Sequence, residues 1–223
     1  MVSEPPSVPG PPRIFEFVGG DLCLDFCNTV GGDRGGVPRE FLHSYPELVA
    51  WSEQAGLLNK QQAENLLRRA ERQPSEAQAI VNRAIELREA LYRLFIEVAK
   101  RKSPVPADLQ MLNDELALSL NRLRVSEHSN GFLYTWTNNV EDLDFPLGPV
   151  ARSAAELLTS RGFGSHIHSC EGQNCGWLFV DSSKNHSRRW CNMRECGNRA
   201  KVKRHRLRKA KAKPQNKPGH TAH

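Results

Sequence analysis

The spacing of apolar residues along the chain predicts a mostly helical fold. In the longest such segment, from residue 75 to about residue 101, large apolar side chains recur every three or four positions, as they do on one face of an amphipathic helix. These side chains are Ile80, Ala84, Leu87, Leu91, Leu94, Phe95 and Val98. Shorter segments with Pro or Gly near one end are also typical of helices, namely 44–58, 60–72, 107–123 and 147–160.

Two segments favour β-strands instead. In 15–30, FEFVGGDLCLDFCNTV, apolar side chains alternate between the two faces, which predicts one or two strands separated at the Gly-Gly pair. In 124–138, the turn sequence Ser-Asn-Gly lies between two runs rich in strand-forming residues, which predicts a hairpin. We therefore expect residues 14–162 to form one α+β domain that is mostly helical and contains few strands.

The charges separate this domain from the rest of the chain. Residues 1–165 carry 17 Lys and Arg against 22 Asp and Glu, whereas residues 166–223 carry 14 against three. A mildly acidic body with a strongly basic appendage favours binding to a polyanion, with nucleic acid as the leading candidate. We expect no membrane partner, because no apolar run approaches the roughly 18 residues of a membrane helix.

The two ends of the chain are predicted to be disordered. The leader 1–13, MVSEPPSVPGPPR, is rich in Pro and lacks the basic and apolar regions of a secretory signal. We therefore expect a cytoplasmic protein with reduced thiols. Residues 212–223 are expected to be a disordered tail, which leaves 163–211 as a second, small domain.

Four of the six cysteines form two similar pairs, CEGQNCG and CNMRECG, with 15 residues between their inner cysteines. Two thiolates on one tight turn can bind a tetrahedral ion together, and the Gly after each pair suits the positive φ that such a turn favours. A redox disulfide is disfavoured by the reducing compartment, and an iron–sulfur cluster usually shows other spacings. The sequence therefore predicts Zn²⁺ bound by Cys170, Cys175, Cys191 and Cys196. Cys23 and Cys27 are expected to be buried small hydrophobes.

The residues between the two pairs predict a small finger. WLFV at 177–180 alternates as a short strand, and SRRW at 187–190 is expected to return as a second strand. With the second cysteine pair on a following helix, this order is typical of a treble-clef-like finger, with a zinc ribbon as the alternative. The finger is expected to end in a basic helix.

That helix is predicted from 194 to 213, where Glu195 is the only acidic residue. Basic residues on most of its sides fit a helix that lies in a groove between phosphate walls. Asn198 and Arg199, at its start, either read bases or brace the zinc knuckle, and the sequence leaves both roles open. The candidate nucleic-acid contacts are Arg188, Arg189, Asn198, Arg199, Lys201, Lys203, Arg204, Arg206 and Arg208.

A candidate ligand site lies in the N-terminal domain. Asp25 and Asn28 are polar residues in an otherwise apolar stretch, and a carboxylate in such surroundings needs a partner. One interpretation is a small-ligand pocket formed by Asp25, Asn28 and Arg34. The other is a structural hydrogen bond or ion pair.

The segment CEGQNCGWLFVDSSKNHSRRWCNMRECGNRAKVKRHR resembles the CGNR zinc finger, whose name is the string at 196–199. Upstream, LCLDFCNTV, LVAWSEQAGLL and PVARSAAELLTS resemble the ABATE domain, a region linked to stress-induced transcription regulation that commonly precedes this finger. The resemblance implies a bacterial DNA-binding regulator. It also implies that the metal ligands of the finger are Cys170, Cys175, Cys191 and Cys196.

The leading hypothesis is therefore a transcriptional regulator with a DNA-binding zinc finger and a body that senses a small molecule. A finger that binds RNA or the ribosome is one alternative. An HNH-type nuclease that uses His186 or His205 with Asn185 is another, but neither His has an acidic or His companion to hold a catalytic metal. We expect no enzymatic activity. A homodimer would be usual for a regulator.

Overall fold

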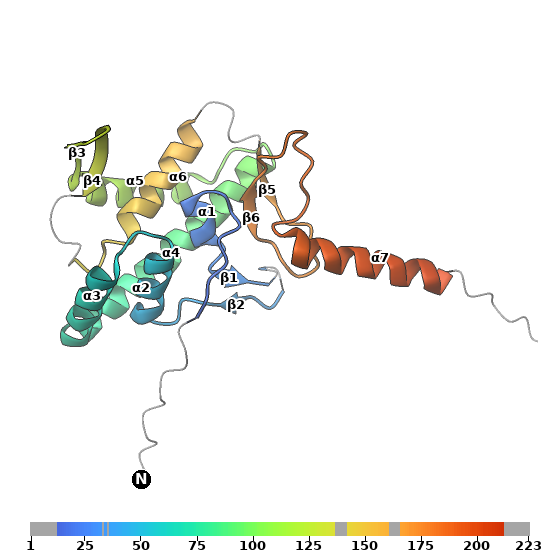
Figure 1. The fold of residues 1–223 in the computed structure, drawn as a ribbon, viewed down its shortest axis with the longest axis horizontal. Helices are drawn as coiled ribbons and strands as arrows, with labels where there is room; N and C mark the ends of the chain where they lie inside the picture. Colours follow the sequence, from blue (N-terminus) through green and yellow to red (C-terminus); the bar gives the residue numbers. More distant parts are fainter. Residues whose placement is uncertain (1–12, 33, 35, 137–141, 161–165, 212–223) are drawn as a thin grey trace, which may run out of the picture.

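The computed structural model describes residues 13–32, 34, 36–136, 142–160 and 166–211 (Figure 1). The helices expected in the body are confirmed, and the long helix α4 runs through its middle, packed against α1, α2, α3 and α5. These body helices are α2 (Tyr45–Gln54), α3 (Lys60–Arg72), α4 (Pro74–Ala99), α5 (Pro106–Leu120) and α6 (Leu147–Thr159).

The strand predicted within 15–30 is wrong, because Leu22–Cys27 forms a short helix, α1. The Asp21 side chain caps this helix by accepting a hydrogen bond from the backbone N–H of Cys23, and Gly20 turns the chain into it with a φ of 78°. Five of its six residues are buried, so apolar side chains occur on every side of the helix. Without a polar face, the sequence pattern could not distinguish this buried helix from a strand.

The strands form three separate antiparallel pairs. The predicted hairpin is confirmed, with its tight turn between His128 and Gly131. The pairs are β1 (Val30–Gly31) with β2 (Arg39–Glu40), β3 (Leu123–His128) with β4 (Gly131–Trp136), and β5 (Ile167–Ser169) with β6 (Leu178–Val180).

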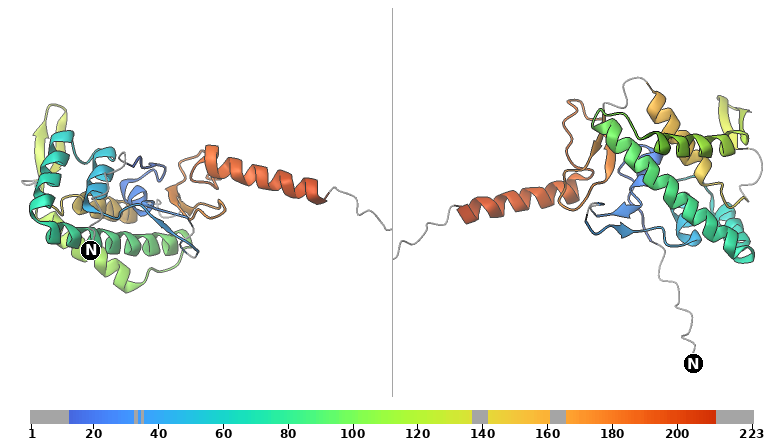
Figure 2. Two further views of the ribbon diagram at one scale, coloured as in Figure 1. Left: turned by 90° about the horizontal axis from the view of Figure 1, so that it is seen from below. Right: turned by 180° about the vertical axis from the view of Figure 1, so that it is seen from behind.

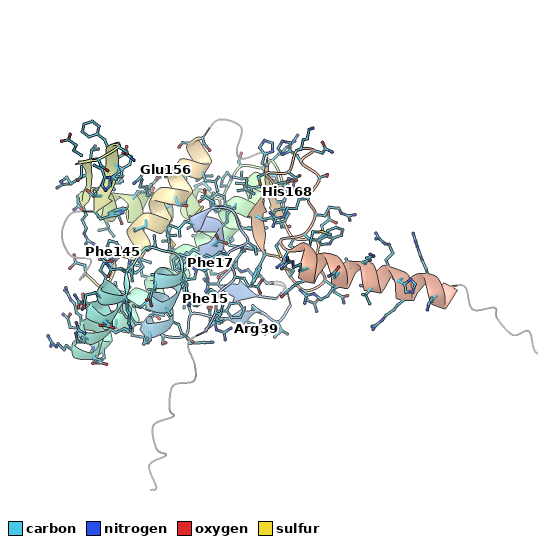
Figure 3. The ribbon with its side chains drawn as sticks, in the orientation of Figure 1. Phe15, Phe17, Arg39, Phe145, Glu156 and His168 are labelled. Carbon is cyan, nitrogen blue, oxygen red and sulfur yellow. The ribbon has the colours of Figure 1, made fainter. Side chains whose placement is uncertain are left out.

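The third pair connects the basic C-terminal region to the body. Ile167, Leu178 and Val180 are buried in the same apolar core as Leu24 of α1 and Leu91 of α4. The residues that follow lead into helix α7 (Asn198–Lys211), which extends away from the rest of the molecule (Figures 1 and 2). Side chains fill the spaces between the body helices, whereas those of α7 project into solvent (Figure 3). The body and the finger base therefore share one core, and α7 stands outside it.

A buried arginine fixes the β1–β2 hairpin to α4. Arg88 is 1% exposed, and its two terminal nitrogens donate to the two carboxylate oxygens of Glu40, both at 2.6 Å. Burial alone would lower the pKa of Arg88, but its hydrogen bonds with Glu40 outweigh that effect and raise it. Glu40 also accepts hydrogen bonds from the backbone N–H groups of Phe41 and Leu42. This carboxylate therefore stabilises both the guanidinium and the turn after β2.

Glu40→Ala should lower the free energy of unfolding by about 3 kcal/mol, because it leaves a buried guanidinium with one of its two acidic partners. Urea denaturation of the purified protein measures this change. Glu156→Ala removes a partly exposed i,i+4 partner of Arg152 and should cost less than about 0.5 kcal/mol. Equal losses for the two variants would contradict the role given to Glu40.

Candidate metal centre and basic helix

The four predicted zinc ligands come together in the structure. All are buried, and their sulfur atoms lie within 4.8 Å of one another. The Cys175 and Cys191 sulfurs are 3.6 Å apart, and those of Cys191 and Cys196 are 3.8 Å apart. Four Zn–S bonds of about 2.3 Å in a tetrahedron place neighbouring sulfurs about 3.8 Å apart. The geometry therefore fits zinc in a site closed by four thiolates.

Glycines allow the two cysteine pairs to approach. Gly176 has the expected positive φ of 79°, but Gly197 does not, since it belongs to a π-helical turn, Met193–Gly197. A side chain at Gly197 would displace only the exposed, flexible end of Met193, whose sulfur lies 2.9 Å from an added Cβ. Gly172, which the sequence analysis missed, is more tightly constrained, because its Cβ would lie 2.8 Å from the Cys196 sulfur. Only a glycine at 172 lets the first knuckle cover the metal centre.

Backbone N–H groups and an arginine side chain donate hydrogen bonds to the cysteine sulfurs. Cys170 Sγ accepts from the backbone N–H groups of Gly172 and Cys191, both at 3.3 Å, and Arg199 Nη2 donates to Cys196 Sγ at 3.1 Å. Hydrogen bonds from the thiols of Cys175 and Cys191 lower the pKa of Cys170, and hydrogen bonds with Cys170 and Cys175 raise the pKa of Cys191. These donors favour a thiolate at Cys170 and offset part of the charge of a four-thiolate centre.

The return strand predicted at 187–190 is wrong, because β6 pairs with β5 instead. The loop after β6 is held by the buried carboxylate of Asp181, which accepts hydrogen bonds from the backbone N–H groups of Ser183 and Arg188 at 2.9 and 2.7 Å. The finger therefore keeps the knuckle and terminal helix of the predicted arrangement, but its strand is completed by residues that precede the first cysteine.

Four of the predicted nucleic-acid contacts are engaged within the finger. Arg188 lies over the ring of Phe179 and donates to the backbone carbonyl groups of Trp190 and Cys191. Arg189 forms an exposed ion pair with Glu171. Asn198 donates to the carbonyl oxygen of Arg194 at 2.9 Å, and Arg199 contacts the Cys196 sulfur as described above.

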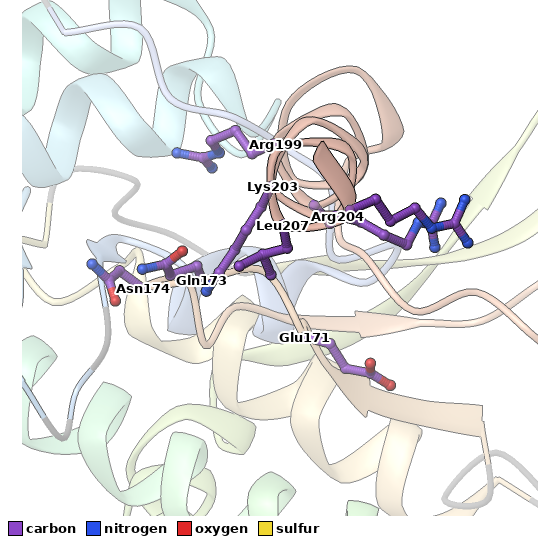
Figure 4. A pocket seen from close by; sticks show the side chains of 9 residues that line it. Glu171, Gln173, Asn174, Arg199, Lys203, Arg204 and Leu207 are labelled. Atoms are coloured by element: carbon purple, nitrogen blue, oxygen red, sulfur yellow. The ribbon is translucent and has the colours of Figure 1, made fainter. Parts of the chain in front are cut away.

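The other candidates lie along α7 in solvent. Each is exposed, and within the described part of the chain none of them forms an ion pair. These residues are Lys201, Lys203, Arg204, Arg206 and Arg208. A cavity of about 720 Å³ lies between α7 and the knuckle, and Figure 4 shows Lys203 extending from the helix toward Gln173.

The structure separates the three candidate ligand-binding residues. Asp25 and Asn28 both line a recess of about 80 Å³, and burial raises the pKa of Asp25 to about 6. Arg34 is not among the lining residues of that recess. Its guanidinium lies 3.6 Å from the ring centroid of Tyr92, forms an ion pair with Glu89 and donates to the carbonyl oxygen of Cys27 at 2.7 Å.

A larger cavity of about 320 Å³, here called the junction cavity, lies between the body and the metal centre. It shares Glu16, Arg39 and Trp177 with the smaller recess, so the two spaces adjoin. Cys175, Cys191 and Cys196 line its finger side. Glu16 and Arg39 are not among the residues predicted from the sequence, because isolated charged residues beside apolar ones carry no signal of a shared cavity.

The histidines proposed for a nuclease do not form a second metal site. His186 packs against His166 with 4.0 Å between the ring centroids, and its Nδ1 lies 3.0 Å from the carbonyl oxygen of Asp181. His205 is exposed on α7. Over the residues that the structure describes, the four cysteines are the only group of three or more metal-binding side chains found close together.

Two protein-family models match the chain. Residues 20–161 match the ABATE family, described as "putative stress-induced transcription regulator", and residues 166–209 match the CGNR zinc finger. No curated protein matches the chain. None of the helices in the described ranges is long and apolar enough to cross a membrane.

The purified protein should contain one zinc ion per chain, and Cys191→Ala should reduce that content to well below one, because three thiolates leave the site open. Elemental analysis after gel filtration measures the ratio. Cys27→Ala is the matched control, since Cys27 is also buried but lies in the body core. Full zinc content in the Cys191 variant would show that these four sulfurs do not hold the metal.

Proposed function

This chain belongs to the ABATE family and carries a CGNR zinc finger, and we propose that it is a transcriptional regulator that binds DNA through α7. The observation that carries the proposal is the set of exposed, unpaired cations on that helix. α7 has 14 residues, a length of about 21 Å at the usual rise per residue. A helix of ordinary diameter fits the major groove of B-DNA, which is about 12 Å wide.

We assign the phosphate contacts to the five exposed cations of α7 named above. A helix inserted between two phosphate walls needs positive charge on several sides, and these residues do not share a single face. For Asn198 and Arg199 the hydrogen bonds to Arg194 and Cys196 support the bracing role rather than base reading. The contacts of Arg188 with Phe179 and the knuckle loop support a structural role for it as well.

Replacing Arg204 and Arg206 together with Ala should weaken binding to duplex DNA and reduce the slope of log K against log salt by roughly 1.8, about 0.9 for each lost phosphate contact. Fluorescence anisotropy of a labelled 20-base-pair duplex at several salt concentrations measures both quantities. The double variant Arg68→Ala, Arg72→Ala removes the same charge from α3 and should leave the slope unchanged.

The same titration distinguishes the alternatives. Tighter binding to single-stranded RNA of equal length than to the duplex would replace DNA with RNA as the target. Cleavage of the probe with added Mg²⁺ would favour the nuclease. An unchanged salt slope in the Arg204 and Arg206 variant would show that α7 is not part of the DNA interface.

We further propose that the protein is cytoplasmic, that its domain boundaries are 14–162 and 163–211, and that it acts as a homodimer.

We also propose that the body senses a small ligand, and that the ligand occupies the junction cavity with its end in the adjoining recess. A volume of about 320 Å³ is within the range of small-molecule sites. Its walls come from both the body and the finger, so a bound molecule would contact both. Glu16 and Arg39 supply charges of both signs, which favour a small, charged and water-soluble molecule.

Arg39→Ala should abolish the stabilisation produced by such a ligand. Arg39 lies over the Phe41 ring and forms no ion pair with the described acidic residues, so its loss should cost the free protein little. Thermal-shift screening of amino acids, carboxylates and amines identifies ligands. The ligand-induced shift in unfolding temperature is then compared between Arg39→Ala and the control Arg72→Ala, which removes a charge from α3 instead. A ligand whose thermal shift survives Arg39→Ala binds elsewhere.

A further inference from the structure

Several hydrogen bonds that attach the finger to the body hold one short segment, residues 176–180, and Arg188 adds another by donating to the carbonyl oxygen of Val18. This segment leads from the second zinc ligand into β6. Among the described residues, five hydrogen bonds join this segment to the N-terminal domain. The bonds run from Tyr92 Oη to the carbonyl oxygen of Gly176 (3.0 Å), from Trp177 Nε1 to that of Val30 (2.7 Å), between Asn28 and Leu178, and from Val180 N to that of Gly19 (2.8 Å).

Asn28 makes the most complete of these contacts. Its Nδ2 donates to the carbonyl oxygen of Leu178 at 2.9 Å, and its Oδ1 accepts from the backbone N–H of the same residue at 2.8 Å. Asn28 is 3% exposed. A single carboxamide thus satisfies both backbone groups of one buried strand residue, as the next strand of a sheet would.

The position of Leu178 explains why a side chain is needed there. β6 pairs with β5 along one edge, and no strand among the described residues pairs with its other edge. A buried strand edge would leave an N–H and a C=O without partners. Asn28 is the residue that follows α1, and its backbone N–H donates to the carbonyl oxygen of Leu24. Its side chain contacts the open edge of β6 from this position.

The same segment fixes the first half of the zinc site. Cys175 lies three residues before Leu178, and the backbone N–H of Cys170 donates to the carbonyl oxygen of Trp177 at 2.7 Å. The second half of the site is held against the first, because the backbone N–H of Cys191 donates to the Cys170 sulfur. Cys196 then precedes the first residue of α7 by two positions. A continuous series of hydrogen bonds and short chain segments therefore connects Asn28, through Leu178 and the cysteines, to the start of α7.

We propose that Asn28 is a positioning residue, which holds Leu178 and so fixes the first cysteine pair and the direction in which α7 leaves the body. Both polar atoms of its side chain are hydrogen-bonded to Leu178, so Asn28 holds this strand even though it also lines the adjoining recess. For DNA this inference rests on the proposed function. For the metal site and the helix direction it does not.

The test compares Asn28→Ala with Ser52→Ala. Ser52 is also fully buried and donates one hydrogen bond, to the carbonyl oxygen of Leu48 at 2.8 Å, but it lies in α2 and does not contact the finger. Both variants lose buried hydrogen bonding, so both should unfold at a lower temperature. Only Asn28→Ala should release zinc faster to the chelator 4-(2-pyridylazo)resorcinol, by roughly tenfold or more, as expected for the loss of both hydrogen bonds to Leu178.

The helix direction is measured separately by pulsed electron paramagnetic resonance. Spin labels on unnatural amino acids at Gln61 in α3 and Lys209 in α7 should give a narrow distance distribution in the parent protein and in Ser52→Ala. Asn28→Ala should broaden it. If zinc release and the distance distribution of Asn28→Ala match those of Ser52→Ala, the proposal is overturned.

Asn28→Asp covers the case in which the alanine variant does not fold. It keeps the acceptor for the Leu178 N–H but places a carboxylate oxygen against the Leu178 carbonyl oxygen where the donor had been, so its zinc release should also be faster than that of the parent. Release at the parent rate would count against the proposal as clearly as an unchanged alanine variant. Neither readout uses DNA, so a failure of the DNA proposal, seen with the Arg204 and Arg206 variants, leaves this result unaffected.

Discussion

The C-terminal region depends on the close approach of four buried cysteines, whose sulfur atoms are positioned to bind one metal ion. α7 has no apolar face that packs on the body, and its cations repel one another. A zinc ion bound by the four cysteines would hold the turn just before this helix, which carries Cys191 and Cys196, against the knuckle formed by Cys170 and Cys175. Metal binding would then supply the folding energy that side-chain burial does not provide here, as it does in other small zinc domains.

The knuckle in turn depends on the body. Leu178 and Val180 are buried in the body core, and backbone groups of the same strand are bonded to Asn28 and Gly19. A finger on a flexible linker would sample many orientations, whereas this one is anchored on both sides of its first cysteine pair. The junction cavity lies at this anchored boundary, where a small molecule would contact both parts at once.

The described basic residues fall into two groups that the sequence does not distinguish: those that are hydrogen-bonded to other parts of the protein and those that are not. Arg88 and Arg188 are engaged with protein acceptors, Glu40 and Trp190 among them, and stabilise the fold. The cations of α7 from Lys201 to Lys209 are exposed and form no ion pairs with the described residues. Unpaired positive charge concentrated on one projecting helix favours a polyanionic partner. The family match to transcription regulators agrees with that interpretation.

The sequence by itself determined the features that depend on local spacing: five body helices, the hairpin at 123–136, and four zinc ligands in two pairs. Tertiary structure decided the rest. α1 was mistaken for a strand because burial on every side removes the periodic signal. The partner of β6, the roles of Asn28 and Arg188, and the need for glycine at 172 all depend on residues far away in the chain. Such contacts form only when the core closes, so no local pattern encodes them.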